Sequence, residues 1–192
     1  HRSTAERLLA SLPNRRETEA SRPWNTPPGP VRTGIELSSS VNFVAEARRL
    51  DHLQADHQGL CALLCANLSR GFLWDRVRVE GGAYGSFASV DGTYPAFTCA
   101  SYRDPNLSRT LRAFDEALGY AASEIDQSEI DGSIVSTIGR IDRPRTPHAR
   151  GFGETLDLLL GRTKAYRAQL REAVLGADES GVRRMATKVR DC

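Results

Sequence analysis

The chain has 192 residues, of which 40% are hydrophobic, so it is long enough and apolar enough to bury a core. Its 26 basic and 24 acidic residues are mixed along the chain and leave a formal charge of +2. This balance gives no electrostatic basis for binding nucleic acid or an anionic membrane. No stretch approaches the roughly 20 apolar residues of a membrane-spanning helix, so a globular domain is expected.

The start of the chain and its cysteines indicate the setting of the protein. The chain begins with His1 and no secretory apolar segment follows, which predicts a piece of a longer protein whose targeting segment lies elsewhere. Four cysteines form no CxxC pair, which predicts reduced thiols in an intracellular protein. They are Cys61, Cys65, Cys99 and Cys192.

The first 30 residues predict a helix and a linker. Leucines over residues 2–12 have helical spacing, and Pro13 ends that pattern. Residues 13–34 are rich in proline and polar side chains, which is typical of an extended connector. We therefore expect residues 1–30 to join a preceding domain to a second domain that spans 31–192.

A strand, a helix and a glycine turn are predicted next. Residues 40–46 alternate as a strand does, and the leucines of 51–70 follow helical spacing. The apolar residues that follow continue as a short helical turn, which ends at Gly81 and Gly82.

A β-hairpin follows this turn. The dipeptide Asp91-Gly92 favours a tight turn with positive φ at both positions, between strands over 83–90 and 93–102. Pro95 has no N–H to donate, which predicts an edge position or a bulge at the start of the second strand.

The C-terminal half predicts four helices. Asp104 as N-cap and Pro105 at the first helical position predict where the first begins. Asp126 and Glu129 form a capping-box pattern for the second, two more flank a glycine stop, and Asp178 caps the last. The order β-α-β-β-α-α-α-α predicts an α+β fold, an antiparallel sheet with helices packed on one face.

Most catalytic signatures are missing from the sequence. His52 and His57 lie about 140° apart around a helix of 3.6 residues per turn, and neither HExxH nor HxxEH occurs. A zincin or inverzincin site therefore cannot be drawn within this chain. GxSxG, P-loop and GxGxxG patterns are also missing.

One local metal candidate remains on the predicted helix over 51–70. His57, Cys61 and Cys65 share one helix face and are good zinc ligands. The outer two lie about 12 Å apart at 1.5 Å per residue, too far to share one ion at roughly 2.0–2.3 Å. The alternative is a stripe of core residues, which is common for free cysteine, and we expect no metal site in this chain.

The residues from Leu73 to Gly85 are the most unusual stretch of the chain. They combine two arginines, Arg76 and Arg78, with a pair of glycines and an aromatic residue. Taken alone, they fit the C-terminal end of a helix. Arginine side chains interact favourably with the helix dipole there, and glycines cap the last turn.

Four ordered segments resemble the C-terminal domain of presequence proteases and related pitrilysin-type, or inverzincin, zinc metallopeptidases. The most specific segment contains Leu-Trp, followed by an Arg that two residues separate from Gly-Gly-Ala-Tyr-Gly. Together the segments cover roughly residues 30–190. They are 73–85, 41–44, 101–107 with Thr110-Leu111, and 138–142 with Pro144, Pro147 and Gly161.

The resemblance implies a site divided between two halves of a longer protein that enclose a chamber. Zinc and its ligands belong to the N-terminal half, and the C-terminal half supplies an Arg and a Tyr that match Arg78 and Tyr84. It implies that Tyr84 donates to the oxyanion, Arg78 binds substrate carbonyls, and Gly81 and Gly82 admit the peptide backbone. Arg76 departs from the family spacing and is interpreted as structural.

The implied function is substrate binding in a zinc metalloendopeptidase that degrades unstructured oligopeptides, such as targeting presequences. Its partners would be the N-terminal half of the same protein and unstructured peptides, with no nucleic acid and no membrane span. The fragment alone would be inactive. The compartment would be mitochondrial or another organelle lumen in a eukaryote, and cytoplasmic in a bacterium. Two alternatives remain, a non-catalytic homologue acting as a partner or scaffold subunit and an unrelated α+β binding domain.

Overall fold

The computed structural model describes residues 2–11, 31–50, 55–91 and 96–192. The chain divides into two units, His1–Leu37 and Ser38–Cys192. The first contains helix α1 (Arg2–Ser11), which agrees with the predicted helix over 2–12. The predicted linker over 13–30 and the predicted turn at Gly92 lie outside the described residues, as do His52 and Pro95.

Three strands form an antiparallel sheet in the order β1-β3-β2. They are β1 (Asn42–Arg49), β2 (Gly85–Asp91) and β3 (Ala96–Asp104). The hairpin pairing of β2 with β3 is confirmed, but β3 is the central strand, and Ala96 pairs with both Arg49 and Asp91. From Ala96 onward β3 therefore has a paired strand on each side, whereas the predicted edge position or bulge at Pro95 lies outside the described residues.

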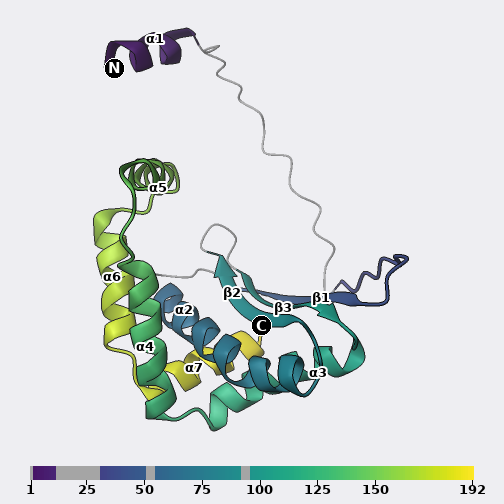
Figure 1. The fold of residues 1–192 in the computed structure, drawn as a ribbon. Helices are drawn as coiled ribbons and strands as arrows, with labels where there is room; N and C mark the ends of the chain where they lie inside the picture. Colours follow the sequence, from purple (N-terminus) through teal and green to yellow (C-terminus); the bar gives the residue numbers. More distant parts are fainter. Residues whose placement is uncertain (1, 12–30, 51–54, 92–95) are drawn as a thin grey trace. The chain divides into compact units, whose positions relative to one another are not determined.

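The helices pack on one face of the sheet, as predicted. Helices α2 and α3 contact the strands, α7 packs against both, and α4 and α6 pack against α2 (Figure 1). Their bounds are α2 (Ala55–Arg70), α3 (Ser108–Ser123), α4 (Gln127–Ile141), α5 (Pro147–Leu159), α6 (Lys164–Leu175) and α7 (Glu179–Arg190). The α+β fold predicted from the order of elements is confirmed.

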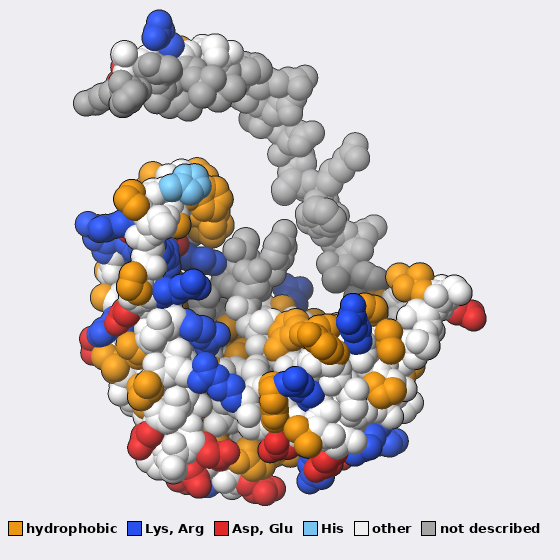
Figure 2. All heavy atoms as spheres, viewed as in Figure 1, with side chains coloured by type: hydrophobic (Ala, Val, Ile, Leu, Met, Phe, Trp, Pro, Cys, Tyr) orange, Lys and Arg blue, Asp and Glu red, His pale blue; other side chains and the backbone are white. Residues whose placement is uncertain are grey.

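The sheet is buried on one face and open on the other. Along β3, Phe97 and Cys99 are buried against the helices, while Tyr102 faces the other way. The open face also carries Phe43 of β1 and Phe87 of β2, which are 69% and 44% exposed. Figure 2 shows hydrophobic side chains gathered beside the strands, an arrangement typical of a binding surface.

Two predicted helix caps are present in atomic detail. The backbone N–H of Glu129 donates to Asp126 Oδ1 at 2.9 Å, and the Asp126 N–H donates back to Glu129 Oε2 at 3.2 Å. Asp178 accepts from the Gly181 N–H at 2.8 Å. Gly161 has a φ of 68° between α5 and α6, which agrees with its predicted role as a stop signal.

The predicted start of α3 is wrong. The helix begins at Ser108, and its N-cap position is Leu107, which makes no side-chain capping bond. Asp104 is instead the last residue of β3 and is fully buried. Its carboxylate accepts hydrogen bonds from nearby hydroxyls, so burial with partners outweighs the capping preference of its residue type.

The predicted helical turn before the glycines is a π-helix, η1 (Trp74–Val79). The Glu80 N–H donates to the Asp75 carbonyl at 2.9 Å, five residues back. The wider turn ends at Gly82, whose φ of 79° suits a residue without a side chain. Single π-turns of this kind occur frequently at functional sites.

Candidate functional site

A hollow of about 530 Å³ lies where η1 ends, beside the end of β3. Its lining comes from η1, from the glycine turn that follows η1 and from the end of β3. Its lining carries positive charge and aromatic rings and contains no acidic side chain. The lining residues are Trp74, Arg78, Val79, Gly82, Ala83, Tyr84 and Arg103.

Arg78 lies in this hollow with its charge available. Its guanidinium stacks over the Trp74 ring, with Cζ 3.8 Å from the ring centre. This cation–π contact orients the guanidinium N–H groups. Among the described residues, no carboxylate pairs with Arg78. The stacked, unpaired guanidinium leaves its N–H edges free to bind a carbonyl or carboxylate.

Tyr84 lines the same hollow and is the residue just before β2. Its N–H donates to the Arg103 carbonyl at 3.2 Å, which fixes the backbone. Its side chain is 60% exposed, and no described residue hydrogen-bonds to its hydroxyl. The structure thus brings Arg78 and Tyr84 together, with a free phenolic donor beside an unpaired cation.

Arg76 faces a different environment from Arg78. It donates to Glu80 at 3.2 Å, and Arg109 reaches the same carboxylate at 3.5 Å. Its guanidinium also lies 5.7 Å from the centre of the Phe72 ring. The position of Arg76 outside the hollow agrees with its interpretation as a structural residue.

The two glycines of the motif have different positions. Gly82 lines the hollow, and its φ of 79° favours a residue without a side chain. Gly81 is buried, and a Cβ would collide with the Val77 carbonyl of η1. The Gly81 carbonyl accepts from Asn106 Nδ2 at 2.6 Å. Gly81 therefore supports the turn beneath the hollow and does not line it.

Arg103 is a site residue that sequence reasoning missed. It lies at the end of β3, lines the hollow and places its guanidinium 5.5 Å from the Tyr84 ring centre. The available signal was its place in the segment 101–107, which supported the family resemblance but gave Arg103 no role of its own. The spatial approach of β3 to the glycine turn is what makes it part of the site.

The cysteines of α2 belong to the core. Cys61 and Cys65 are buried among apolar side chains, and burial raises the pKa of the Cys61 thiol to about 12. Burial raises the pKa of Cys65 well above its ordinary value as well. In the described part of the chain, no group of three or more His, Cys, Asp or Glu residues could hold a metal ion. These residues do not fit a zinc ion.

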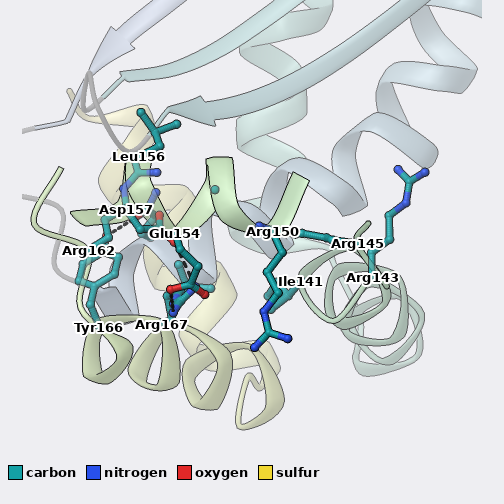
Figure 3. Close-up of a pocket in the computed structure, with 13 residues that line it drawn as sticks. Ile141, Arg143, Arg145, Arg150, Glu154, Leu156, Asp157, Arg162, Tyr166 and Arg167 are labelled. Carbon is teal, nitrogen blue, oxygen red and sulfur yellow. Dashed lines mark hydrogen bonds and ion pairs between the residues drawn. The ribbon is translucent and has the colours of Figure 1, made fainter. Parts of the chain in front are cut away.

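A second hollow, of about 610 Å³, lies among the ends of α4, α5 and α6 (Figure 3). Arg167 of α6 donates to Glu154 at 2.9 Å and to Asp157 at 3.1 Å, which links α6 to α5. The hydroxyl of Tyr166 donates to Gln58. None of the predicted site residues lines this hollow, and the ion pairs of Arg167 join two of its helices. No helix in the described ranges is long and apolar enough to cross a bilayer.

Comparison with known sequences gives one family. Residues 34–191 match the family described as the PreP C-terminal domain. The chain is 36% identical over 148 residues to presequence protease 1, chloroplastic/mitochondrial, from Arabidopsis thaliana. That match covers 76% of this chain but 14% of the relative, so the chain spans a small part of the relative's length.

Solved structures share the fold. Pitrilysin matches with a TM-score of 0.56 and 14% identity, over 75% of this chain and 16% of that chain. The inactive peptidase domain of a Bordetella parapertussis protein assigned as a zinc protease gives a TM-score of 0.64 and 16% identity. That match covers 79% of this chain and 88% of the other. At these identities the likeness shows the fold alone.

Proposed function

Because the chain belongs to the family of presequence protease C-terminal domains, we propose that it is the substrate-binding C-terminal part of a zinc metalloendopeptidase. Its substrates are unstructured oligopeptides, such as targeting presequences, degraded inside a closed chamber. The observation that carries the proposal is the hollow in which Arg78 and Tyr84 meet without any acidic lining residue. The family match excludes an unrelated α+β binding domain.

Tyr84 acts as the hydrogen-bond donor to the carbonyl of the scissile peptide. Its free, exposed hydroxyl is the kind of group that stabilises negative charge as it develops on that oxygen. Because the backbone of Tyr84 is tied to β3 through the Arg103 carbonyl, the donor needs little reorganisation when substrate arrives.

Arg78 holds the peptide beside Tyr84. A guanidinium stacked on an indole is restricted in orientation, so less side-chain freedom is lost when it binds a substrate carbonyl. Gly82 leaves space for the peptide backbone at the same point. The open aromatic face of the sheet, which includes Phe87 and Tyr102, offers apolar contacts to flanking side chains.

The zinc of this function lies in another part of the full-length protein. Among the described residues, no group of three or more His, Cys, Asp or Glu could hold a metal ion, and the chain is 36% identical to a presequence protease. The N-terminal half of the same protein is therefore the main partner of this domain. In a eukaryote the compartment is an organelle, as the name of the Arabidopsis relative indicates for that protein.

Tyr84→Phe in the full-length protein tests the proposed role of the hydroxyl. By analogy with removing one oxyanion donor, kcat should fall ~10²–10³-fold with little change in unfolding temperature. The measurement is cleavage of an unstructured peptide of about 20 residues, with and without a chelator, beside circular dichroism of both proteins. Wild-type turnover in the variant would remove Tyr84 from the mechanism.

The chain by itself should hydrolyse no peptide, because no group of three or more His, Cys, Asp or Glu among its described residues could hold a metal ion. The assay incubates the purified 192-residue chain with the same peptide and added zinc, and follows products by mass spectrometry. The full-length protein serves as the positive control. Chelator-sensitive cleavage by the isolated chain would contradict this prediction.

The alternative is a non-catalytic homologue that acts as a partner or scaffold subunit. The fold of this domain also occurs in an inactive peptidase domain, so the fold alone does not require catalysis. The unpaired Arg78 and free Tyr84 hydroxyl favour the catalytic assignment, because a scaffold gains nothing from them. A folded full-length protein that cleaves none of several unstructured peptides would support the alternative.

A further inference from the structure

Arg103 has a strained backbone at the edge of the candidate site. Its φ of 49° is the one positive value among the described non-glycine residues. This region is disfavoured for a residue with a side chain, and such strain persists where the surrounding structure fixes it. Strained residues of this kind cluster at functional sites.

The surroundings of Arg103 hold this conformation in place. On one side, its carbonyl accepts from the Tyr84 N–H at 3.2 Å. On the other, buried Asp104 accepts from Ser101 Oγ at 2.6 Å, Thr110 Oγ1 at 2.7 Å and the Asn106 N–H at 2.8 Å. The end of β3 is therefore fixed on both sides of the strained residue.

The same turn places two β3 side chains against the ring of Tyr84. The Arg103 guanidinium lies 5.5 Å from the ring centre, within range of a cation–π contact. The Tyr102 ring meets it edge-on, with centres 5.5 Å apart and planes at 61°. Gly85 makes room for this contact, because a Cβ there would collide with the Tyr102 ring.

We propose that Arg103, together with Tyr102, is a positioning residue that holds the Tyr84 ring in its reactive orientation. This role rests on the function proposed above for the Tyr84 hydroxyl. No carboxylate among the described residues pairs with Arg103, so its side chain is committed to the Tyr84 ring and not to an ion pair. A ring held before substrate binds loses less freedom in the transition state.

Arg103→Gly in the full-length protein separates this role from a structural one. Glycine adopts a positive φ without strain, so the unfolding temperature should stay within about 3 °C of wild type. The expected result is a kcat lower by ~10–100-fold, with KM changed less, because the reacting donor is misplaced. Arg112→Ala, at an exposed position of α3, is the control and should leave both constants unchanged.

A double-mutant cycle with Tyr84→Phe completes the test. If Arg103 acts through the hydroxyl, Arg103→Gly should lower kcat further by less than about twofold once that hydroxyl is gone. Fully additive losses, or a wild-type kcat in Arg103→Gly, would overturn the positioning role while leaving the function of Tyr84 intact. Wild-type turnover in Tyr84→Phe itself would instead remove the proposed function, and this role with it.

Two further variants cover the possibility that glycine unfolds the end of β3. Arg103→Met keeps the aliphatic stem without the charge and should show the same loss of kcat. Arg103→Lys keeps a cation near the ring and should retain most of the activity. Equal activity of the Met and Lys variants would overturn the cation–π part of the proposal.

Discussion

Arg76 and Arg78 lie two positions apart on η1 and have different surroundings. Arg76 pairs with Glu80, whereas Arg78 stacks on Trp74 inside the hollow. The wider π-turn sets which side chain faces which way. Two residues of the same type therefore make a matched pair for testing the site.

Arg78→Ala should weaken both binding and turnover in the full-length protein. Loss of charge-assisted hydrogen bonds to the substrate predicts a kcat/KM lower by roughly 10–100-fold. Arg76→Ala is the control, since it removes an exposed ion pair worth about 0–1 kcal/mol and should leave peptide cleavage unchanged. Equal kinetics for the two variants would favour a helix-end role for both arginines.

At the scale of elements, Asp104 joins β3 to α3. Its buried carboxylate accepts from Ser101 of the strand and Thr110 of the helix. Asn42 of β1 donates through Nδ2 to the Asp104 carbonyl at 3.0 Å. One residue therefore ties two strands and a helix together next to the site.

Asp104→Ala should destabilise the chain by about 2–4 kcal/mol, because it leaves buried donors without an acceptor. Urea unfolding of the 192-residue chain, followed by circular dichroism, measures this loss. Asp131→Ala, at an exposed position of α4, should change stability by no more than about 0.5 kcal/mol. A variant at Asp104 as stable as that control would contradict the role of Asp104 as a junction.

Helix α5 shows a limit of reasoning from apolar spacing. Its apolar positions predicted a helix correctly, yet none of its residues is buried. Phe152 is 67% exposed and Leu159 is 78% exposed. Periodicity gives the helix but does not say whether its apolar face packs against this chain, because that depends on where neighbouring elements lie.

At the scale of the whole molecule, three of the four cysteines belong to the core. Cys61, Cys65 and Cys99 are buried, and Cys192 is exposed. Burial raises the pKa of the Cys61 and Cys99 thiols from 9.0 to about 12. The buried thiols therefore stay protonated and unreactive at neutral pH.

This burial predicts both thiol reactivity and alkaline stability. A thiol reagent should modify Cys192 rapidly in the folded chain and all four cysteines in denaturant. Because unfolded thiols ionise near 9.0 and folded ones near 12, their contribution to stability is full below pH 9 and is lost as pH rises toward 12. Urea unfolding at pH 8 to 11 measures the slope, which should be smaller in Cys99→Ala. Rapid modification of more than one thiol in the folded chain would contradict the core assignment.

The sequence by itself determined the α+β fold and most helix positions, and its resemblance to a known family singled out Arg78 and Tyr84. The fold follows from local causes, such as the capping pair of Asp126 and Glu129 and the apolar periodicity of the helices. Tertiary structure alone decided the burial of Asp104 and the entry of Arg103 into the site. Both depend on β3 returning to the centre of the sheet and meeting the turn after η1, a contact between distant segments that no local pattern encodes.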